Sequence, residues 1–480
     1  MSTDAAQKAP ANSADANREK EVIKGLVTKA RAAMAQFANA DQARVDEAVT
    51  ALAWSIYEPT RARELAALAV EDTGLGNIDS KIMKNQRKTF GCLRDLSRVR
   101  SVGIIEEIPE KGLVKYAKPV GVVAAVTPST NPAATPVNKA MFAIKGRNAV
   151  IIAPSPAGIG TTTKTVGYMR AELEKIGLPA DLVQVLPAPV NKQLTQELMY
   201  ACDLVIVTGS QNNVKRAYSS GTPAIGVGAG NVPVVIDETA DFDDAAEKIC
   251  KSKIFDNSTS CSSENSLIIL DSVYDQAMDA LKRAGGYLCS AEEKEKVREN
   301  LWVDGHLNRH VIAKDADILA DVFGLGDQAK GNKFFMVEEG TADADSKFID
   351  EKLSLVLTIY RAKDMDDVVK QLNTILDVCG KGHSVGIHTK VMEHADRLAA
   401  EIDVVRVLVN QAHTFGNGGG FDNGLNFTLS MGGGTWAGNS IDDNLNYRHF
   451  INITHLVKTI PEDKPSEEAL FGAHWEKYGK

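Results

Sequence analysis

Short apolar runs alternate with helical stretches over residues 119–237, and this pattern constrains the fold more than any other feature of the chain. Strands that are apolar on both faces must be covered on both faces, so the alternation predicts a parallel sheet between helices. Ligands of such sheets bind beyond the carboxyl ends of the strands. The apolar runs are Val120–Val126, Ala149–Ile152, Leu182–Leu186, Leu204–Val207 and Val234–Ile236, and the helical stretches are Pro136–Lys145, Thr161–Ile176, Lys192–Tyr200 and Asn212–Ser219.

The segments on either side have their own patterns. Residues 18–100 repeat apolar side chains at helical spacing, which predicts a helical region. Residues 101–118 alternate polar and apolar side chains around a turn, as an exposed two-stranded ribbon does. Beyond residue 259 strand-like and helical segments resume, which predicts a second α/β domain.

Composition excludes several classes of protein. Hydrophobic residues make up 44% of the 480, enough to build cores, so the chain is not disordered as a whole. No apolar run approaches the ~18 residues of a membrane span, and we expect no membrane partner. A net charge of -9 argues against a nucleic-acid partner. Six cysteines without a CxxC pair, and no secretory signal, favour the cytoplasm.

Cys261 is the residue that most strongly indicates chemistry. It follows a polar loop rich in serine and threonine and precedes an apolar strand. A cysteine acts as a nucleophile through its thiolate, which needs nearby backbone donors or a cation. An inert, buried cysteine is the alternative, and the pattern alone leaves both interpretations open.

The other signals are weaker. Gly158 and Gly160 open a helix, but the third glycine of a dinucleotide fingerprint is Thr163. No carboxylate closes the strand that ends near Pro154, so nothing there would repel a 2′-phosphate, and NADP is admissible. His383 lies between glycines, where it either reaches a site or stays solvated. The histidines show no metal-ligand spacing, and we expect no metal.

Several motifs together resemble one family. They are Pro128-Ser129-Thr130-Asn131-Pro132, the run from Tyr218 to Asn231, Phe255-Asp256-Asn257 with Cys261, and Glu351-Lys352-Leu353-Ser354. In this order they resemble the aldehyde dehydrogenase superfamily, and more narrowly its CoA-acylating branch, from about Arg18 to Thr459. The segments Thr259–Ser266, Val409–His413 and Asn444–His449 further resemble acylating enzymes for sulfoacetaldehyde.

The resemblance implies roles for individual residues. Cys261 would attack the aldehyde carbonyl, and the Asn131 amide with the Cys261 N–H would form the oxyanion hole. Glu351 would hold the nicotinamide ribose, and the cofactor would be NADP or NAD, with NADP preferred. The residues expected along the cofactor groove are Thr127, Pro128, Ser155, Gly209, Ser210, Val227, Gly228 and Glu351.

One departure from the hydrolytic branch points to the second half of the reaction. Hydrolytic members carry a glutamate that activates water, and registration on Gly230 and Pro233 places that position on Val227. A valine takes no proton, so a thioester would persist until a thiol such as CoA arrives. By resemblance, His383 would assist that thiol.

The acyl group is open at this point. Hydroxyls flank Cys261, and a wall of Ser260 and Ser262 with Asn410 or His413 could hydrogen-bond a sulfonate. Alternatively these hydroxyls satisfy one another. Sulfoacetaldehyde is the first expectation and acetaldehyde the second. A hydrolytic enzyme and a non-catalytic scaffold or shell-associated member of the fold are the other hypotheses.

The predicted fold is therefore α/β and aldehyde dehydrogenase-like. It combines a Rossmann-like cofactor domain, an α/β catalytic domain and a small oligomerisation ribbon. The resemblance implies a homodimer or homotetramer in which the ribbon and the tail after Trp436 pair with a neighbouring subunit. The predicted division is a disordered segment 1–17, the cofactor domain 18–258 with ribbon 101–118, the catalytic domain 259–434 and a returning segment 435–480.

Overall fold

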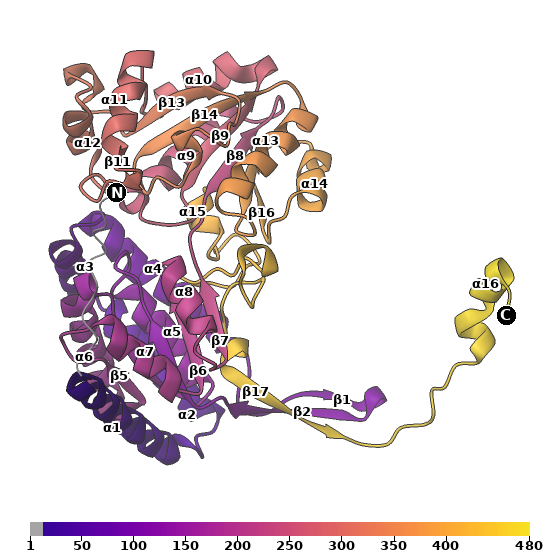
Figure 1. The fold of residues 1–480 in the computed structure, drawn as a ribbon. Coiled ribbons are helices and arrows are strands. Elements are labelled where there is room, and N and C mark those ends of the chain that lie inside the picture. Colours follow the sequence, from indigo (N-terminus) through magenta and orange to yellow (C-terminus); the bar gives the residue numbers. More distant parts are fainter. Residues whose placement is uncertain (1–12) are drawn as a thin grey trace, which may run out of the picture.

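The computed structural model describes residues 13–480 and shows two α/β bodies joined by several crossings of the chain, with a long arm at one end (Figure 1). The first twelve residues of the segment predicted to be disordered lie outside the described residues. Its last five, residues 13–17, belong to helix α1 (Ser13–Phe37).

A parallel five-stranded sheet forms the core of the first body, as the alternation predicts. Its strands, in spatial order, are β5 (Val183–Val185), β4 (Ala149–Ala153), β3 (Val122–Val126), β6 (Leu204–Thr208) and β7 (Ala224–Val227). All five residues of β3 and of β4 are buried, which explains their continuous apolar sequence. The helices around the sheet are α1, α5 (Ala134–Lys145), α6 (Ile159–Lys175), α7 (Lys192–Ala201) and α8 (Gln211–Tyr218).

The apolar run Val234–Ile236, expected to lie with these strands, belongs to the other body. It forms β8 (Val232–Ile236), which pairs with β9 and β15 of the second sheet. An apolar run indicates burial on both faces but not which sheet supplies the neighbours. The chain changes sheet between β7 and β8, so the division predicted at residues 258 and 259 falls within the second body's chain.

Seven parallel strands form the second sheet. In spatial order they are β10 (Gly286–Leu288), β13 (Phe334–Gly340), β14 (Val356–Ala362), β9 (Glu264–Leu270), β8, β15 (Val385–His388) and β16 (Val407–Val409). Its helices are α9 (Phe242–Ile254), α10 (Tyr274–Arg283), α11 (Ala291–Leu301), α12 (Ala316–Phe323), α13 (Met365–Val378) and α14 (Met392–Glu401), and a small ribbon, β11 (Trp302–Val303) and β12 (His306–Leu307), lies beside them.

Besides α1, three helices precede the first sheet, as the helical spacing predicts: α2 (Gln42–Tyr57), α3 (Pro59–Thr73) and α4 (Ile78–Ser97). The Asn77 side chain caps α4 by accepting from the Ser80 N–H. Helix α4 is unusual because Lys81, Lys84 and Lys88 are among its buried residues. Buried cations require partners or a functional reason.

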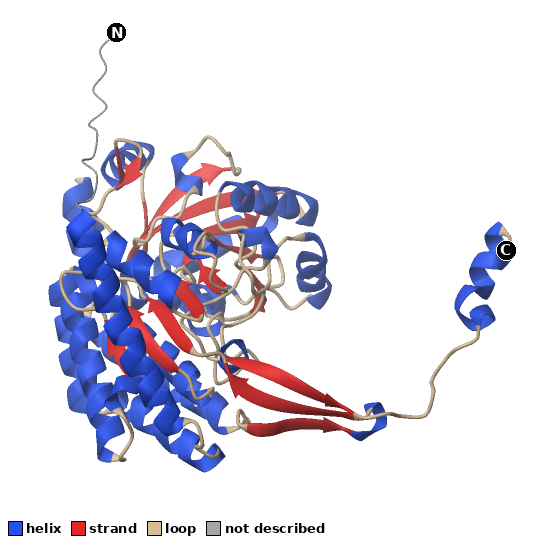
Figure 2. Cartoon of the chain, turned by 60° about the horizontal axis from the view of Figure 1, so that its bottom comes forward, coloured by secondary structure: helices blue, strands red, loops and turns tan. Residues whose placement is uncertain are grey.

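The exposed ribbon is present and has a third strand. β1 (Gly103–Ile108) and β2 (Leu113–Pro119) are antiparallel, and β17 (Ile451–Val457) joins β2 on its other edge. The tail thus pairs with the ribbon of its own chain. Beyond it, α16 (Glu467–Tyr478) has no buried residue and extends away from both bodies (Figures 1 and 2). Within residues 13–480, none of the helices has the length and apolar character to cross a bilayer.

Candidate active site

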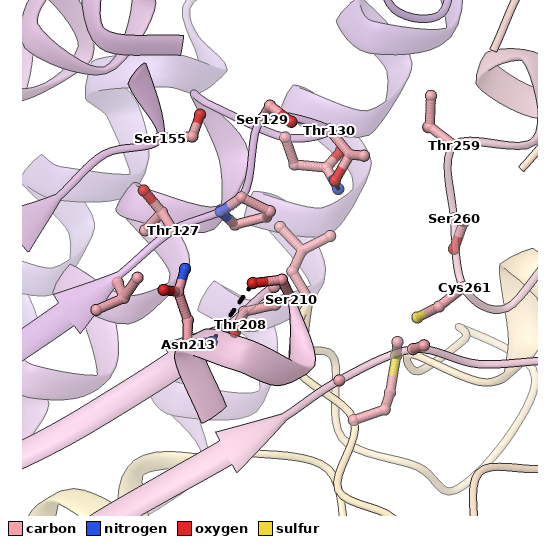
Figure 3. Close-up of a pocket in the computed structure, with 18 of the residues that line it drawn as sticks. Thr127, Ser129, Thr130, Ser155, Thr208, Ser210, Asn213, Thr259, Ser260 and Cys261 are labelled. Carbon is pink, nitrogen blue, oxygen red and sulfur yellow. Dashed lines mark hydrogen bonds between the residues drawn. The ribbon is translucent and has the colours of Figure 1, made fainter. Parts of the chain in front are cut away.

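A cavity of about 1210 Å³ lies where the two bodies meet. One wall consists of the loops that follow β3, β4, β6 and β7, which is where the parallel sheet predicts a ligand. Lys139, buried in α5, donates to the carbonyls of Val126 (2.6 Å) and Ile206 (3.2 Å) and so fixes two neighbouring strand ends. Figure 3 shows these loops facing the Cys261 loop across the cavity.

All but one of the residues predicted along the cofactor groove line the cavity, most of them on this wall. Thr127, Pro128, Ser155, Gly209, Ser210 and Gly228 line the cavity there, and Glu351 lines it from the second body, in the segment before β14 (Val356–Ala362). Ser210 caps α8 by accepting from the Asn213 N–H (3.4 Å, Figure 3), and Ser155 caps the short helix after β4 in the same way. Val227 is the exception: it ends β7 and is 3% exposed, outside the lining.

Backbone at this wall can approach a large ligand closely. Gly209 has a φ of +151°, and a Cβ added there would meet only Pro128, at 4.0 Å. Together with the two capped helix starts, open glycine backbone suits a dinucleotide's phosphates. The wall therefore offers the space and the backbone donors that a nicotinamide dinucleotide requires.

Cys261 lies on the opposite wall, partly exposed, between a turn and strand β9. Asp256, Asn257 and Ser258 all have φ between +51° and +61°, a left-handed conformation that costs non-glycine residues free energy. The buried Asp256 carboxylate holds this turn by accepting from the amines of Lys81 (3.1 Å) and Lys84 (2.5 Å). The strained turn places the thiol in the cavity rather than in the core.

Burial, and after it the charge of Glu351, raise the pKa of the Cys261 thiol to about 12, whereas Ser262 and Arg406 act in the opposite direction. Arg406 is buried and fixed by bonds to Asn444 Oδ1 (3.0 Å), the His383 carbonyl (3.0 Å) and the Gly432 carbonyl (2.7 Å). The thiol is therefore protonated at neutral pH, with one fixed cation favouring its ionised form.

The Asn131 amide also lines the cavity and has almost no partner in the protein. Its Nδ2 makes one long contact, 3.4 Å to Thr130 Oγ1, and its Oδ1 is buried without a hydrogen bond among the described residues. A buried, uncommitted amide is costly unless a ligand uses it. Its Nδ2 is available to donate to an oxygen of a ligand in the cavity.

Glu351 precedes the buried Lys352 and shares the cavity with Cys261. Burial raises the pKa of Glu351 to about 8, against the opposing effect of the Gly230 N–H. Its carboxyl group is therefore largely neutral at pH 7. A neutral carboxyl can both donate and accept toward a ribose diol.

His383 lies close behind the Cys261 loop but outside the cavity lining. Its Nδ1 is 2.8 Å from Ser384 Oγ, and its buried Nε2 has no partner among the described residues. A Cβ on Gly230 would meet the Cys261 carbonyl at 2.3 Å and the His383 ring at 3.0 Å. Burial, followed by Arg406, lowers the pKa of His383 to about 3, so the ring is neutral.

The predicted substrate residues separate into two groups. Ser260 and Ser262 line the cavity beside Cys261. Asn410 is exposed outside the lining, and its amide is bonded to the Thr389 backbone on both sides (2.9 and 2.7 Å). His413 is buried, with Nε2 2.9 Å from Ser384 Oγ. Proximity in sequence to an apolar strand could not show which way these side chains turn.

The hydroxyls around Cys261 mostly bond within the protein. Ser258 and Ser263 contact each other at 3.0 Å, and Thr259 donates to the Asp256 carboxylate at 2.8 Å. Ser262 accepts from the Asn417 amide at 2.9 Å. Most of these hydroxyls therefore have hydrogen-bond partners within the protein, as the alternative interpretation predicts.

Sequence reasoning missed the cations of the cavity. Lys84, Arg87 and Lys88 of α4 line one end, and Lys192, Lys215 and Arg216 line the other. The spacing of the first three, i, i+3 and i+4, places them on one helix face and was the available signal. Their helix lies far from Cys261 in sequence, so only the tertiary structure brings them together.

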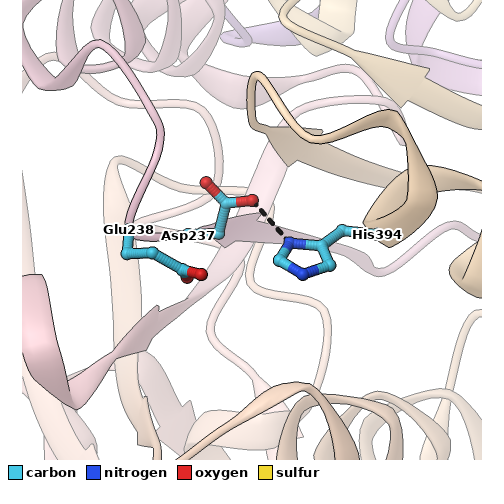
Figure 4. Close-up of side chains that lie close together, drawn as sticks. All are labelled: Asp237, Glu238 and His394. Carbon is cyan, nitrogen blue, oxygen red and sulfur yellow. Dashed lines mark hydrogen bonds and ion pairs between the residues drawn. The ribbon is translucent and has the colours of Figure 1, made fainter.

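A second cluster of titratable groups lies away from the cavity, at the end of β8 (Figure 4). Asp237 accepts from the Thr239 N–H and hydroxyl (2.8 and 2.7 Å), and its other oxygen lies 2.8 Å from His394 Nδ1. Glu238 is the third member. These bonds connect the loop after β8 to helix α14, which is a structural role.

Comparisons with known proteins agree with this geometry. The model of the aldehyde dehydrogenase family matches residues 4–295. The chain is 51% identical to an acylating sulfoacetaldehyde dehydrogenase of Cupriavidus necator, over 96% of this chain and 94% of the relative. It is 44% identical to one of Bilophila wadsworthia, over 94% and 98%. The crystal structure of an acetylating aldehyde dehydrogenase from Geobacillus thermoglucosidasius matches 94% of this chain and 99% of its own, with a TM-score of 0.90 and 33% identity.

The chain therefore belongs to the aldehyde dehydrogenase family. The narrower resemblance, to the CoA-acylating branch and to its sulfoacetaldehyde enzymes, is confirmed as well. The predicted α/β fold of this family is also confirmed.

Proposed function

We propose that this protein oxidises sulfoacetaldehyde to sulfoacetyl-CoA, as a CoA-acylating aldehyde dehydrogenase with a nicotinamide cofactor. The observation that carries the proposal is the position of Cys261. It is partly exposed and shares one cavity with the largely unpaired Asn131 amide and with a wall suited to a dinucleotide. The named activity of relatives at 51% and 44% identity supports the substrate.

The chemistry of the first half follows from three groups. The Cys261 thiol first loses its proton to water in the open cavity. The thiolate then adds to the aldehyde carbon, forming the S–C bond, and the carbonyl oxygen gains the electron pair. The Asn131 Nδ2 and the Cys261 N–H donate to this oxyanion, and one such donor contributes about 3–4 kcal/mol. A bound nicotinamide supplies the acceptor for the hydride that leaves this carbon. A thioester on Cys261 remains.

The second half depends on what the site lacks. At the position where hydrolytic members carry their glutamate, Val227 is buried at the end of β7. Without a glutamate at that position to activate water, the thioester waits for a thiol, and transfer of the acyl group to CoA frees Cys261. His383 is neutral and lies behind the loop, so we assign it a supporting role: its free Nε2 can accept a proton if the loop moves.

The experiment follows reduction of NADP with sulfoacetaldehyde, with and without CoA. We expect sustained turnover only with CoA, sulfoacetyl-CoA as the product, and at most one equivalent of NADPH per site without it. Sustained formation of free sulfoacetate in the absence of CoA would contradict the proposal and favour a hydrolytic enzyme.

Acetaldehyde is the second candidate substrate. The self-satisfied hydroxyls around Cys261 and the similarity to a solved acetylating enzyme favour it. Comparing kcat/KM for the two aldehydes decides between them.

We propose NADP as the preferred cofactor. Among the described residues that line the cavity, the only acidic side chain is Glu351, which we place at the nicotinamide ribose. Lys192 and Lys215 line the far end of the same wall and suit an extra phosphate. The ratio of kcat/KM for NADP and NAD tests this preference.

We also propose a homodimer or homotetramer that works in the cytoplasm. The ribbon and α16 offer exposed apolar side chains, among them Val457, Leu470 and Phe471, which a second copy would cover. All six cysteines are free, as a reducing compartment favours. The mass of the full chain in solution, compared with a chain ending at residue 457, tests the assembly.

A further inference from the structure

One end of the cavity carries more positive charge than the protein itself neutralises. Lys84, Arg87 and Lys88 of α4 all line it, and a bond of 3.2 Å from Lys84 Nζ to Thr259 Oγ1 joins this helix to the Cys261 loop. The substrate of the proposed function is an anion, and the inference below rests on that proposed function. A cation can bind this anion only if no carboxylate of the protein already pairs with it.

Lys84 is already paired. Its Nζ lies 2.5 Å from the Asp256 carboxylate, which also accepts from Lys81 at 3.1 Å. Asp256 itself belongs to the left-handed turn before Cys261, and these ion pairs stabilise that turn. Lys84 is thus committed to the protein's own structure.

Lys88 has no such partner. It is only 9% exposed, and its Nζ donates to a neutral group, the Gly418 carbonyl, at 2.8 Å, with the Phe427 ring centroid 5.5 Å away. No carboxylate in residues 13–480 lies within ion-pair distance of this amine. Burying an unpaired ammonium is costly, and an arriving anion would offset that cost.

Arg87 stands beside it with its donors also largely free. Its guanidinium lies 5.2–5.5 Å from the ring centroids of Phe415, Phe421 and Phe427, and makes one long bond, 3.4 Å, to the Phe415 carbonyl. Asp422 is the carboxylate that acts on it, from beyond ion-pair distance. Aromatic stacking fixes the plane of a guanidinium and leaves its edge for a planar or tetrahedral oxyanion.

The position suits a short substrate. In sulfoacetaldehyde a single methylene separates the sulfonate from the carbon that Cys261 attacks, so the anchor must lie near the thiol. Burial, followed by Arg87, lowers the pKa of Lys88 to about 7, and a thiolate at Cys261 is among the charges that act in the opposite direction. Gly418 allows the Lys88 amine to pack closely against the backbone, since a Cβ there would stand 2.7 Å from the Lys88 Nζ.

We propose that Lys88 and Arg87 bind the sulfonate of the substrate and set the preference for an anionic aldehyde. The sulfonate oxygens accept from the Lys88 ammonium and the Arg87 guanidinium. The aldehyde carbon then lies against Cys261, with its oxygen toward Asn131. The hydroxyls of Ser260 and Ser262 shape the wall between them.

The test compares sulfoacetaldehyde with propionaldehyde, which is similar in length and uncharged. Lys88→Met removes the charge and keeps most of the volume, and Arg87→Gln does the same at the second position. We expect each to lower kcat/KM for sulfoacetaldehyde by on the order of 100-fold, the value of one charge-assisted bond, and to leave propionaldehyde within about threefold. Arg94→Gln is the matched control, because Arg94 contacts Phe421 and Phe427 from the same helix outside the cavity lining.

A second measurement does not depend on turnover. Ethanesulfonate should protect the Cys261 thiol of the wild-type protein and of Arg94→Gln from iodoacetamide, and should not protect Lys88→Met. Equal losses for both aldehydes in the variants, or full protection of Lys88→Met, would overturn the assignment.

The same measurements separate an error in the proposed substrate from an error in the proposed sulfonate anchor. If the wild-type protein itself prefers propionaldehyde, the proposed substrate is wrong. If it prefers sulfoacetaldehyde and both variants keep that preference, the proposed function stands and the anchor lies elsewhere.

Discussion

The two ends of the cavity are built in different ways. The cofactor end consists of backbone and small polar side chains at the carboxyl ends of β3, β4, β6 and β7. The substrate end consists of long side chains from α4, the Cys261 loop and the segment from Thr414 to Met431. The first is a product of the sheet's topology, whereas the second is assembled from segments far apart in the chain.

The difference shows where specificity can change. A groove made of backbone accepts any ligand of the right shape and tolerates substitution of its side chains. A wall made of charged side chains selects by chemistry, and one substitution can redirect it. We therefore expect changes at the substrate end to alter which aldehyde reacts, and changes at the cofactor end to alter affinity.

Cys261, where the two ends meet, should show the largest effect. Cys261→Ala removes the nucleophile, so acylating turnover should fall on the order of 10⁴-fold or more. Binding of NADPH, measured by its fluorescence, should persist because the cofactor wall is unchanged. Cys379→Ala is the control, since that cysteine is also partly exposed but lies outside the cavity lining. Comparable losses in both variants would refute the assignment of the nucleophile.

Asn131 lies on the cofactor wall, but we propose that its amide donates to the oxyanion of the reaction. Asn131→Ala should lower kcat about 100- to 1000-fold, because the oxyanion loses a fixed donor. Its KM for NADP should change little. Asn212→Ala, at the far end of the same wall, should leave kcat unchanged. A rise in KM without a fall in kcat would assign Asn131 to binding alone.

Ser155 tests how far the cofactor end selects by charge. Ser155→Asp places a carboxylate where we expect a 2′-phosphate, and the repulsion should lower kcat/KM for NADP on the order of tenfold relative to NAD. Ser155→Asn keeps the polarity and the capping without the charge and should leave the ratio unchanged. Equal effects of the two variants on the ratio would place the phosphate elsewhere.

The coupling of Cys261 to Glu351 gives the smallest effect and a pH dependence. With the thiol pKa near 12, the iodoacetamide reaction of Cys261 should accelerate about tenfold per pH unit from pH 6 to 8. Above pH 8 Glu351 ionises and opposes the thiolate, so the slope should decrease. Glu351→Gln should retain the full slope and react about threefold faster at pH 9, because the charge that opposes the thiolate is gone. Identical profiles would show that the two groups do not interact.

The sequence predicted the first sheet and its ligand-binding loops because both depend on local pattern. Strands buried on both faces, as β3 and β4 are, leave a continuous apolar run whatever surrounds them. Cys261 was identifiable because its polar flank contrasts with the strand that follows. The assignment of β8 to the second sheet could not be predicted, since its apolar sequence suits either.

Side-chain direction limited the prediction of the site. Asn410 and His413 lie near Cys261 by resemblance, yet their bonds to Thr389 and Ser384 turn them elsewhere. From the sequence, Lys88 would be interpreted as an exposed cation of an amphipathic helix. Its burial depends on Gly418 and Phe427, more than 300 residues later, and no local pattern encodes such a contact.

The arm that ends in α16 has a consequence for handling the protein. A twelve-residue helix with no buried side chain is only marginally stable in water, and the linker before it offers a protease an extended, accessible backbone. In isolation one subunit should be clipped there first, with the catalytic core left intact. Resistance to such nicking would then report whether neighbouring molecules are shielding the tail.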